Sequence, residues 1–218
     1  MIEIAQLYTI KGGRMLNFLE THIEAIKIAG FILVIILVIA LIISSHNDLE
    51  ENIKLFTEKY GFQRFDEASK QAGVSEVIKK SSHYSKRWSA TYPILQGDGE
   101  SIFRMVSTNS NSYHYLAAYW SRTQAADVII QRCAFNIHEI VVDGLEEYYF
   151  SAKDEAAARE TAGKLRDFLK RHEFRYEIEI SNGNLIVVED QWPPSLEDFE
   201  SLLQAGRETR ALLAGEGK

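Results

Sequence analysis

The sequence contains a single cysteine, Cys133, among its 218 residues. One cysteine excludes a disulfide within the chain and a metal site built from several thiolates. Cys133 lies among apolar neighbours, between the segments 128–130 and 134–135. We therefore expect a small buried side chain there, because a reactive thiol needs an accessible, electropositive setting.

Motifs that carry common chemistries are scarce. The six histidines form no cluster and no pair four residues apart, the spacing typical of helical metal sites. They are His22, His46, His83, His114, His138 and His172. There is no Gly-x-Ser-x-Gly nucleophile motif, and Gly12-Gly13 lacks the strand-turn-helix context of a phosphate loop. The sequence thus predicts no catalytic residue, no cofactor and no metal site.

Two pairs of adjacent carboxylates, Glu146-Glu147 and Glu189-Asp190, fall at expected strand ends or loops. Side chains of adjacent strand residues point to opposite faces of a sheet. We therefore do not expect either pair to cooperate in acid–base catalysis.

Positive charge is in deficit. The chain has 24 Lys and Arg against 31 Asp and Glu, a formal net charge of −7. Residues 1–45 are balanced, so the negative charge belongs to the remainder of the chain. An acidic surface argues against nonspecific nucleic-acid binding, and we expect no nucleic-acid partner.

One unbroken apolar run, Ile28 to Ile43, is the dominant feature of the sequence. Ser44 and Ser45 extend it to 18 positions without a charge. At about 1.5 Å per residue, a helix of this length just spans a hydrocarbon core of about 30 Å. We expect residues 28–45 to form a single transmembrane helix.

Two other interpretations of this run remain open. A cleaved signal peptide has an apolar stretch of about 7–15 residues and a small-x-small cleavage site, and Ile43-Ser44-Ser45 is a poor site of that kind. A buried core helix normally carries a polar stripe, and this run is apolar all round. Length and uniformity favour a retained single-pass signal-anchor in the bilayer of the cell (inner) membrane.

The flanking charges favour one orientation. Lys27 abuts the apolar run, whereas the first basic residue after it is Lys54. Positive residues near a span tend to stay in the cytoplasm. We therefore expect a cytoplasmic N-terminus and an extracytoplasmic head.

The remaining 173 residues suffice for one domain with a hydrophobic core. Leu49, Ile53, Phe56 and Tyr60 recur at helical spacing before Gly61, a residue that commonly ends helices. Shorter helices are expected at 65–72 and 75–80. The expected divisions are a tail at 1–27, the transmembrane helix at 28–45, a helical stalk at 46–84, a head at 85–213 and a frayed tail at 214–218.

The head pattern predicts strands, then helices. Turn-rich residues 109–111 separate two expected strands, and Asp143-Gly144 and Asn182-Gly183 mark further hairpins. The expected strands cover 102–108, 113–122, 126–135, 137–142, 145–150, 176–180 and 185–188. Ser151 with Asp154, and Ser195 with Asp198, have the spacing of capping boxes before two amphipathic helices. These elements predict an α+β head, a mostly antiparallel sheet with two packing helices.

Several stretches give this head a family resemblance. They are YPIL (92–95), the tyrosine-rich segment from 113, DEAAARETAGKLRDFLKRH (154–172), NGNLIVVE (182–189) and the helix after Trp192-Pro193-Pro194. Over about residues 85–213, the chain resembles an uncharacterised bacterial family of membrane-associated proteins carrying a domain of unknown function. Members often look as if they have more than one membrane span, and this chain has one. The resemblance implies a bacterial envelope setting and supplies no activity.

Two segments are candidate surfaces. The first concentrates basic and aromatic side chains, which suit anionic headgroups and the membrane interface. It comprises Lys79, Lys80, Tyr84, Lys86, Arg87 and Trp88; an ordinary solvated helix end is the alternative. The second is a stripe of Tyr113, Tyr115 and Tyr119 on one strand face. We expect the two helices to cover this stripe as core, whereas an exposed stripe would suit a protein partner.

Three classes of function fit these features. The leading hypothesis is a non-enzymatic, membrane-anchored interaction or assembly module, whose partners are the lipid bilayer and either another protein or a second copy. The second is a membrane-tethered, hydrolase-like enzyme in which the fold assembles a cleft around His83 or His138. The third is a lipid-surface binding module.

Overall fold

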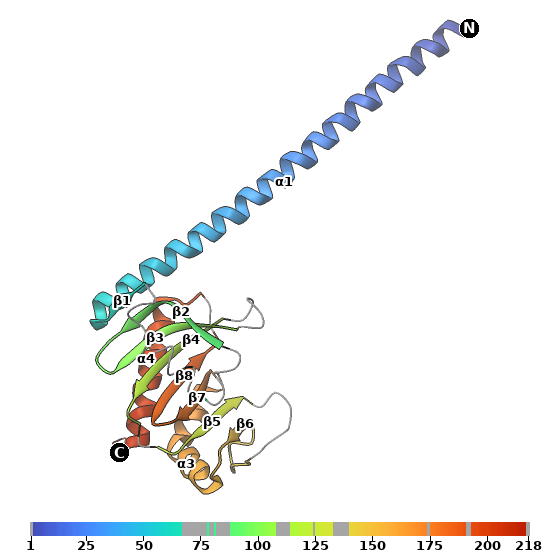
Figure 1. Cartoon of the computed structure of the whole chain (residues 1–218). Helices are drawn as coiled ribbons and strands as arrows, with labels where there is room; N and C mark the ends of the chain where they lie inside the picture. Colours follow the sequence, from blue (N-terminus) through green and yellow to red (C-terminus); the bar gives the residue numbers. More distant parts are fainter. Residues whose placement is uncertain are drawn as a thin grey trace. The chain divides into compact units, whose positions relative to one another are not determined.

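In the computed structural model, the chain divides into two compact units, Met1–Asp48 and Leu49–Lys218. We call the second unit the head. Its described part is α+β, as predicted, with a mostly antiparallel sheet and further helices (Figure 1). The structure describes residues 2–66, 78, 81, 88–107, 114–123, 125–132, 140–173, 175–190 and 193–216.

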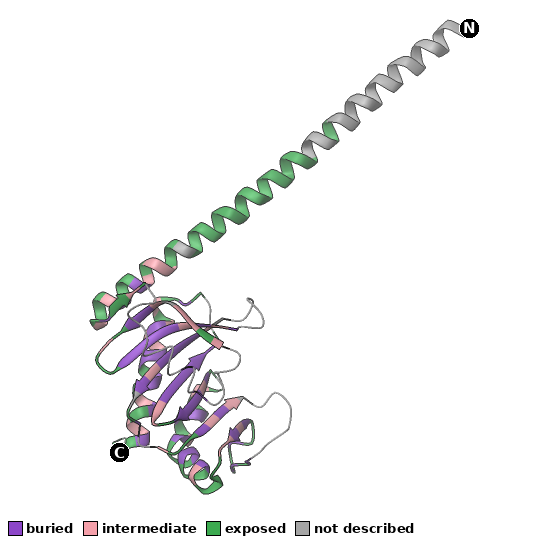
Figure 2. Ribbon diagram, viewed as in Figure 1, coloured by how far each residue is buried: buried purple, intermediate pink, exposed green. Residues whose placement is uncertain are grey.

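Helix α1 (Ile2–Tyr60) contains the entire apolar run. Residues 27–45 are exposed, in keeping with a segment that is apolar on every side (Figure 2). Within the described residues, this is the one helix long and apolar enough to cross a membrane, judged by length and composition.

The head is built on an eight-stranded sheet in the order β1-β2-β3-β4-β8-β7-β5-β6, and all paired strands are antiparallel. The strands are β1 (Gln63–Phe65), β2 (Trp88–Gln96), β3 (Glu100–Ser107), β4 (His114–Ser121), β5 (Val128–Arg132), β6 (Tyr148–Ser151), β7 (Tyr176–Ser181) and β8 (Asn184–Glu189). The predicted β3–β4 pairing is confirmed. In place of a hairpin around Asp143-Gly144, the described chain has one bridge between Ile140 and Phe150.

The β7–β8 hairpin forms as the sequence predicted. Asn182 and Gly183 have φ angles of 51° and 73°, both in the left-handed region that a type I′ turn requires. The turn sets the register, so that Ser181 faces Asn184 and Tyr176 faces Glu189. This register later brings charged residues together at the open end of the hairpin.

Strand β2 was not predicted, because Pro93 lies in its middle. Proline lacks the N–H that a ladder hydrogen bond needs and is found at edges or bulges. The structure accommodates Pro93 by a register shift between Thr91 and Ile94 in the pairing with β3. Phe65, expected to begin a helix, instead ends strand β1, which pairs with β2.

Helices α3 and α4 begin at polar caps. Helix α4 (Leu196–Ala214) has the predicted capping box of Ser195 and Asp198. Helix α3 (Glu155–His172) was predicted with a cap at Ser151, but Asp154 caps it. The Asp154 carboxylate accepts hydrogen bonds from the backbone N–H groups of the first turn, whereas Ser151 still belongs to β6.

The sheet has two different faces. The main hydrophobic core lies on one face and combines side chains of α3 and α4 with strand residues such as Trp120. Ile53 and Phe56, from the end of α1, are buried in this core. Part of the segment expected to form a stalk therefore packs within the head. A second, smaller cluster lies on the opposite face and includes Ile78 and Ile186.

The contact between Trp120 and Gly206 lets α4 pack closely against the sheet. Trp120 is fully buried, and a Cβ atom built on Gly206 would lie 1.7 Å from its ring carbon Cη2. Only glycine leaves room for the indole at this point of the helix. The indole N–H also donates a hydrogen bond of 2.9 Å to the Glu100 carboxylate, so its orientation is fixed at both ends.

We predict that Gly206→Ala lowers the free energy of unfolding by about 1–3 kcal/mol, the usual cost of overpacking a core. Gly163→Ala is the matched control, since Gly163 also lies in a helix and has no atom within 4 Å of an added Cβ. The control should be neutral or gain about 0.5–1 kcal/mol. Urea unfolding of the full chain in detergent measures both, and equal stabilities would contradict the packing argument.

Candidate functional site

Tyr115 and Tyr119 of the predicted tyrosine stripe lie on the sheet face opposite α3 and α4. Leu116, Ala118 and Trp120 of β4 join the main core, whereas Tyr115 and Tyr119 pack against the smaller cluster. The expectation that α3 and α4 cover the stripe is therefore wrong. Those helices cover the face that holds most of the large apolar side chains, because burial there removes the most apolar surface from water.

Trp88, Tyr115 and Tyr119 form what we call the aromatic patch. All three are half-buried, and the ring centroids of Trp88 and Tyr115 lie 4.5 Å apart. The Tyr119 hydroxyl makes a 3.0 Å hydrogen bond to Asn184 Oδ1, and burial raises the pKa of Tyr119. The patch thus offers partly accessible aromatic area held in a defined geometry.

Most of the predicted basic and aromatic segment lies outside the described residues. This applies to Lys79, Lys80, Tyr84, Lys86 and Arg87, and equally to Tyr113, Cys133, His83 and His138. Ile78 and Ser81, on either side of the two lysines, are described and buried. The Ser81 hydroxyl makes a 2.7 Å hydrogen bond to the buried Glu179 of β7, which places Ser81 at the sheet.

The structure assembles a charged cluster that the sequence analysis missed. Arg175 donates from Nε to Glu189 Oε1 at 2.5 Å and from Nη2 to Asp198 Oδ1 at 3.3 Å. Glu189 is only 5% exposed, and its Oε2 has no hydrogen-bond partner within the described residues. Burial raises the pKa of Glu189, and the guanidinium of Arg175 partly opposes this shift.

Two further titratable side chains adjoin this cluster. Burial, followed by the nearby charge of Glu189, raises the pKa of Tyr176 to about 12. Burial lowers the pKa of His172, whose ring centroid lies 5.2 Å from that of Tyr176. Perturbed titration of neighbouring groups can mark a functional site, but structural ion-pair networks produce it too.

The cluster is best explained as a structural clamp. Arg175 occupies one oxygen of Glu189 and ties the end of the β7–β8 hairpin to Asp198 at the start of α4. A signal for the clamp was present in the sequence, since the Asn182-Gly183 turn places Glu189 opposite Tyr176, next to Arg175. As expected for adjacent residues, Asp190 is exposed while Glu189 is buried.

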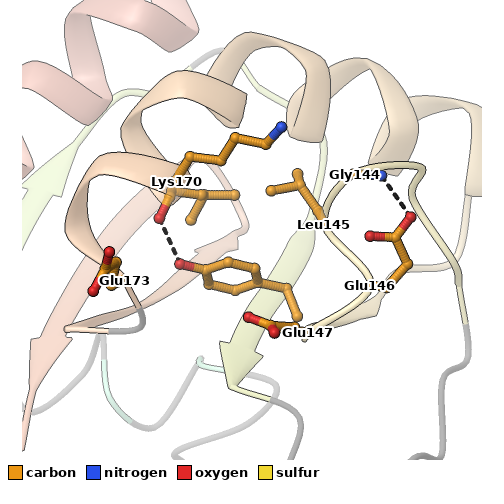
Figure 3. Close-up of a pocket in the computed structure, with 8 residues that line it drawn as sticks. Gly144, Leu145, Glu146, Glu147, Lys170 and Glu173 are labelled. Atoms are coloured by element: carbon orange, nitrogen blue, oxygen red, sulfur yellow. Dashed lines mark hydrogen bonds between the residues drawn. The ribbon is translucent and has the colours of Figure 1, made fainter.

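A pocket of about 490 Å³ lies between the loop before β6 and the end of α3 (Figure 3). Glu146 accepts a 2.7 Å hydrogen bond from the backbone N–H of Gly144, which lowers the pKa of Glu146. The Tyr148 hydroxyl donates to the carbonyl of Leu169 at 2.7 Å. In Figure 3 the carboxylates of Glu146, Glu147 and Glu173 are spread around the pocket and do not converge. This arrangement stabilises the loop and assembles no reactive pair.

A second pocket is small and apolar, about 10 Å³, and lies among core side chains such as Ile53 and Leu116. In the described part of the chain, no group of three or more His, Cys, Asp or Glu side chains is placed to hold a metal ion.

No protein-family model and no curated protein matches the sequence. The resemblance to a bacterial membrane-associated family therefore stays a prediction. Among solved structures, the chain is similar to the crystal structure of the mycobacterial trehalose monomycolate transport factor A, TtfA. The TM-score is 0.52 at 14% sequence identity, and the match covers 76% of this chain and 94% of that chain. At this identity, the similarity concerns the fold alone.

We predict that Arg175→Ala destabilises the protein by about 1–3 kcal/mol, because it leaves a buried acceptor unpaired. Arg171→Ala is the control, since Arg171 pairs with Glu208 but is 59% exposed. Exposed ion pairs contribute about 0–1 kcal/mol. Equal losses in urea unfolding would contradict a special role for the buried carboxylate.

The loss of stability caused by Arg175→Ala should also depend on pH. Because burial raises the pKa of Glu189 in the folded state, its protonated form favours folding at low pH, and this contribution disappears as the pH rises above about 4.5. Without Arg175 the carboxylate has no counter-charge and its pKa should rise further, so the penalty should grow as the pH rises through the raised folded-state pKa and should be smallest at and below the ordinary value of 4.5. A penalty that is constant between pH 4 and 7 would contradict this assignment.

Proposed function

We propose that this chain is a membrane-anchored interaction or assembly module of the bacterial envelope. The observation that carries the proposal is the combination, in one chain, of an apolar helical segment of membrane-spanning length and a folded α+β head. The segment positions the molecule at the bilayer, and the head provides the surface for protein contacts.

The fold of the head supports an envelope role. TtfA, which is described as a trehalose monomycolate transport factor, has a similar fold. We infer that the present chain serves a comparable kind of task, in which a membrane-bound factor supports the movement or assembly of envelope components. Its own cargo and partners are not implied by that similarity.

The aromatic patch is the surface we propose for the partner. Tyrosine and tryptophan are enriched where proteins meet and often dominate the binding energy. Trp88, Tyr115 and Tyr119 pack against the smaller cluster, on the sheet face opposite α3 and α4. Their partial exposure gives them apolar area to bury against another protein.

Site-specific photocrosslinking in native membranes tests this proposal. A benzophenone side chain at Tyr115 replaces one aromatic residue of the patch with another. The same group at Lys164, on the exposed side of α3, is the control. We expect a discrete adduct, with a different protein or a second copy, from position 115 and none from position 164. Recovery of the protein alone from both positions would overturn the proposed partner surface.

The proposed orientation places the head outside the cytoplasm, since Lys27 abuts the apolar run and no basic residue follows it before Lys54. In a Cys133→Ser background, Asp98→Cys provides a thiol in an exposed turn of the head. A membrane-impermeant maleimide should label this thiol in intact spheroplasts. Gly13→Cys, on the other side of the span, should be labelled only after lysis. The reverse pattern would place the head in the cytoplasm.

A further inference from the structure

Three arginines from distant parts of the chain line one pocket of the head. The pocket has a volume of about 590 Å³ and lies between the end of β4 and the last turns of α4. Arg122 and Thr123 contribute from the β4 side, and Arg207 and Arg210 from α4. Residues three apart on a helix share a face, so both α4 arginines belong to the same side of α4.

The positive charge of this pocket is only partly neutralised. Arg207 is bound to the carboxylate of Glu100, with an Nε–Oε2 distance of 3.1 Å. Arg122 and Arg210 are exposed, and neither has an ion-pair partner within the described residues. Glu216 contributes one carboxylate at the pocket lining. Two guanidinium groups thus remain available in a chain whose overall charge is negative.

The backbone holds Arg122 in an uncommon conformation. Its φ of 64° lies in the left-handed region, where residues other than glycine and asparagine are infrequent. The next residue is fixed, because the Thr123 N–H donates a 2.8 Å hydrogen bond to the carbonyl of Gly183 in the β7–β8 turn. Strained residues held by their surroundings are often found at binding sites.

Thr123 belongs to the same wall, and its buried hydroxyl group is unsatisfied. The residue is 9% exposed, and its hydroxyl oxygen has no hydrogen-bond partner within the described residues. Buried hydroxyl groups are normally paired, so one that is unpaired calls for an explanation such as an ordered water.

We propose that this pocket binds a phosphoryl group carried by a small molecule or by a lipid headgroup. Guanidinium groups present paired N–H donors that match phosphate oxygens. Two guanidinium groups carry two positive charges, which balance a divalent anion better than they balance a single carboxylate. The volume falls in the range typical of small-molecule sites, which leaves room for the body that carries the phosphate. This inference is independent of the proposed partner surface, which lies on other residues.

Binding is tested with the full chain in phosphatidylcholine nanodiscs at physiological salt. Calorimetric titration uses inorganic pyrophosphate and glycerol 3-phosphate as soluble probes. A parallel preparation in nanodiscs containing phosphatidylglycerol reports on lipid, by native mass spectrometry of the lipid molecules that stay bound. Saturable binding in the first arm identifies a soluble ligand, and specific retention in the second identifies a headgroup.

Arg122→Gln and Arg210→Gln should each weaken binding about tenfold or more, as expected for loss of a charge-assisted contact. Arg159→Gln removes the same charge from α3, where Arg159 pairs with Glu155, and should change binding less than about twofold because surface pairs contribute little. Unchanged thermal unfolding of the variants shows that they fold. Absence of saturable binding in both arms would overturn the proposal. Equal effects of all three variants would do so as well, since they would indicate attraction by net charge alone.

Discussion

The close contact between Trp120 and Gly206 is the constraint on which the architecture of the head depends. Because residue 206 has no side chain, α4 approaches the sheet closely enough for a fully buried indole to fill the space between them. Glu100 joins this contact to the surface, since its carboxylate accepts from the Trp120 indole and from Arg207. One glycine thereby determines the position of the helix, the orientation of a strand side chain and the place of an arginine that lines a pocket.

The two faces of the sheet differ in how much apolar surface they bury. One face is covered by α3, α4 and the last turns of α1, and it holds most of the buried apolar side chains. The other has a smaller cluster and partly exposed aromatic rings. Stability is concentrated on the first face, so the second can vary its surface for recognition without loss of the core. The clamp of Arg175, Glu189 and Asp198 connects the hairpin of the sheet to the helix that covers it.

Sequence patterns predicted the elements whose signals are local. The Asn182-Gly183 turn, the Ser195–Asp198 cap and the apolar run of α1 each depend on residues close together in the chain. Strand β2 was not predicted because Pro93, a residue uncommon inside strands, lies in its middle. The choice of sheet face for the tyrosines was wrong because alternation defines two faces but does not say which one the helices cover. The arginine pocket combines residues far apart in sequence, and only the folded chain brings them together.

The contribution of α1 to the head limits where a protease could separate the head from the apolar run. Ile53 and Phe56 are core residues of the head, although they belong to the same helix as the apolar run. A protease that cut before Leu49 would free a head with its core complete. A cut after Tyr60 would leave these side chains with the apolar run and expose the apolar surface they had covered. Shedding of an intact head is therefore restricted to cleavage in the few residues between the apolar run and the first core side chain.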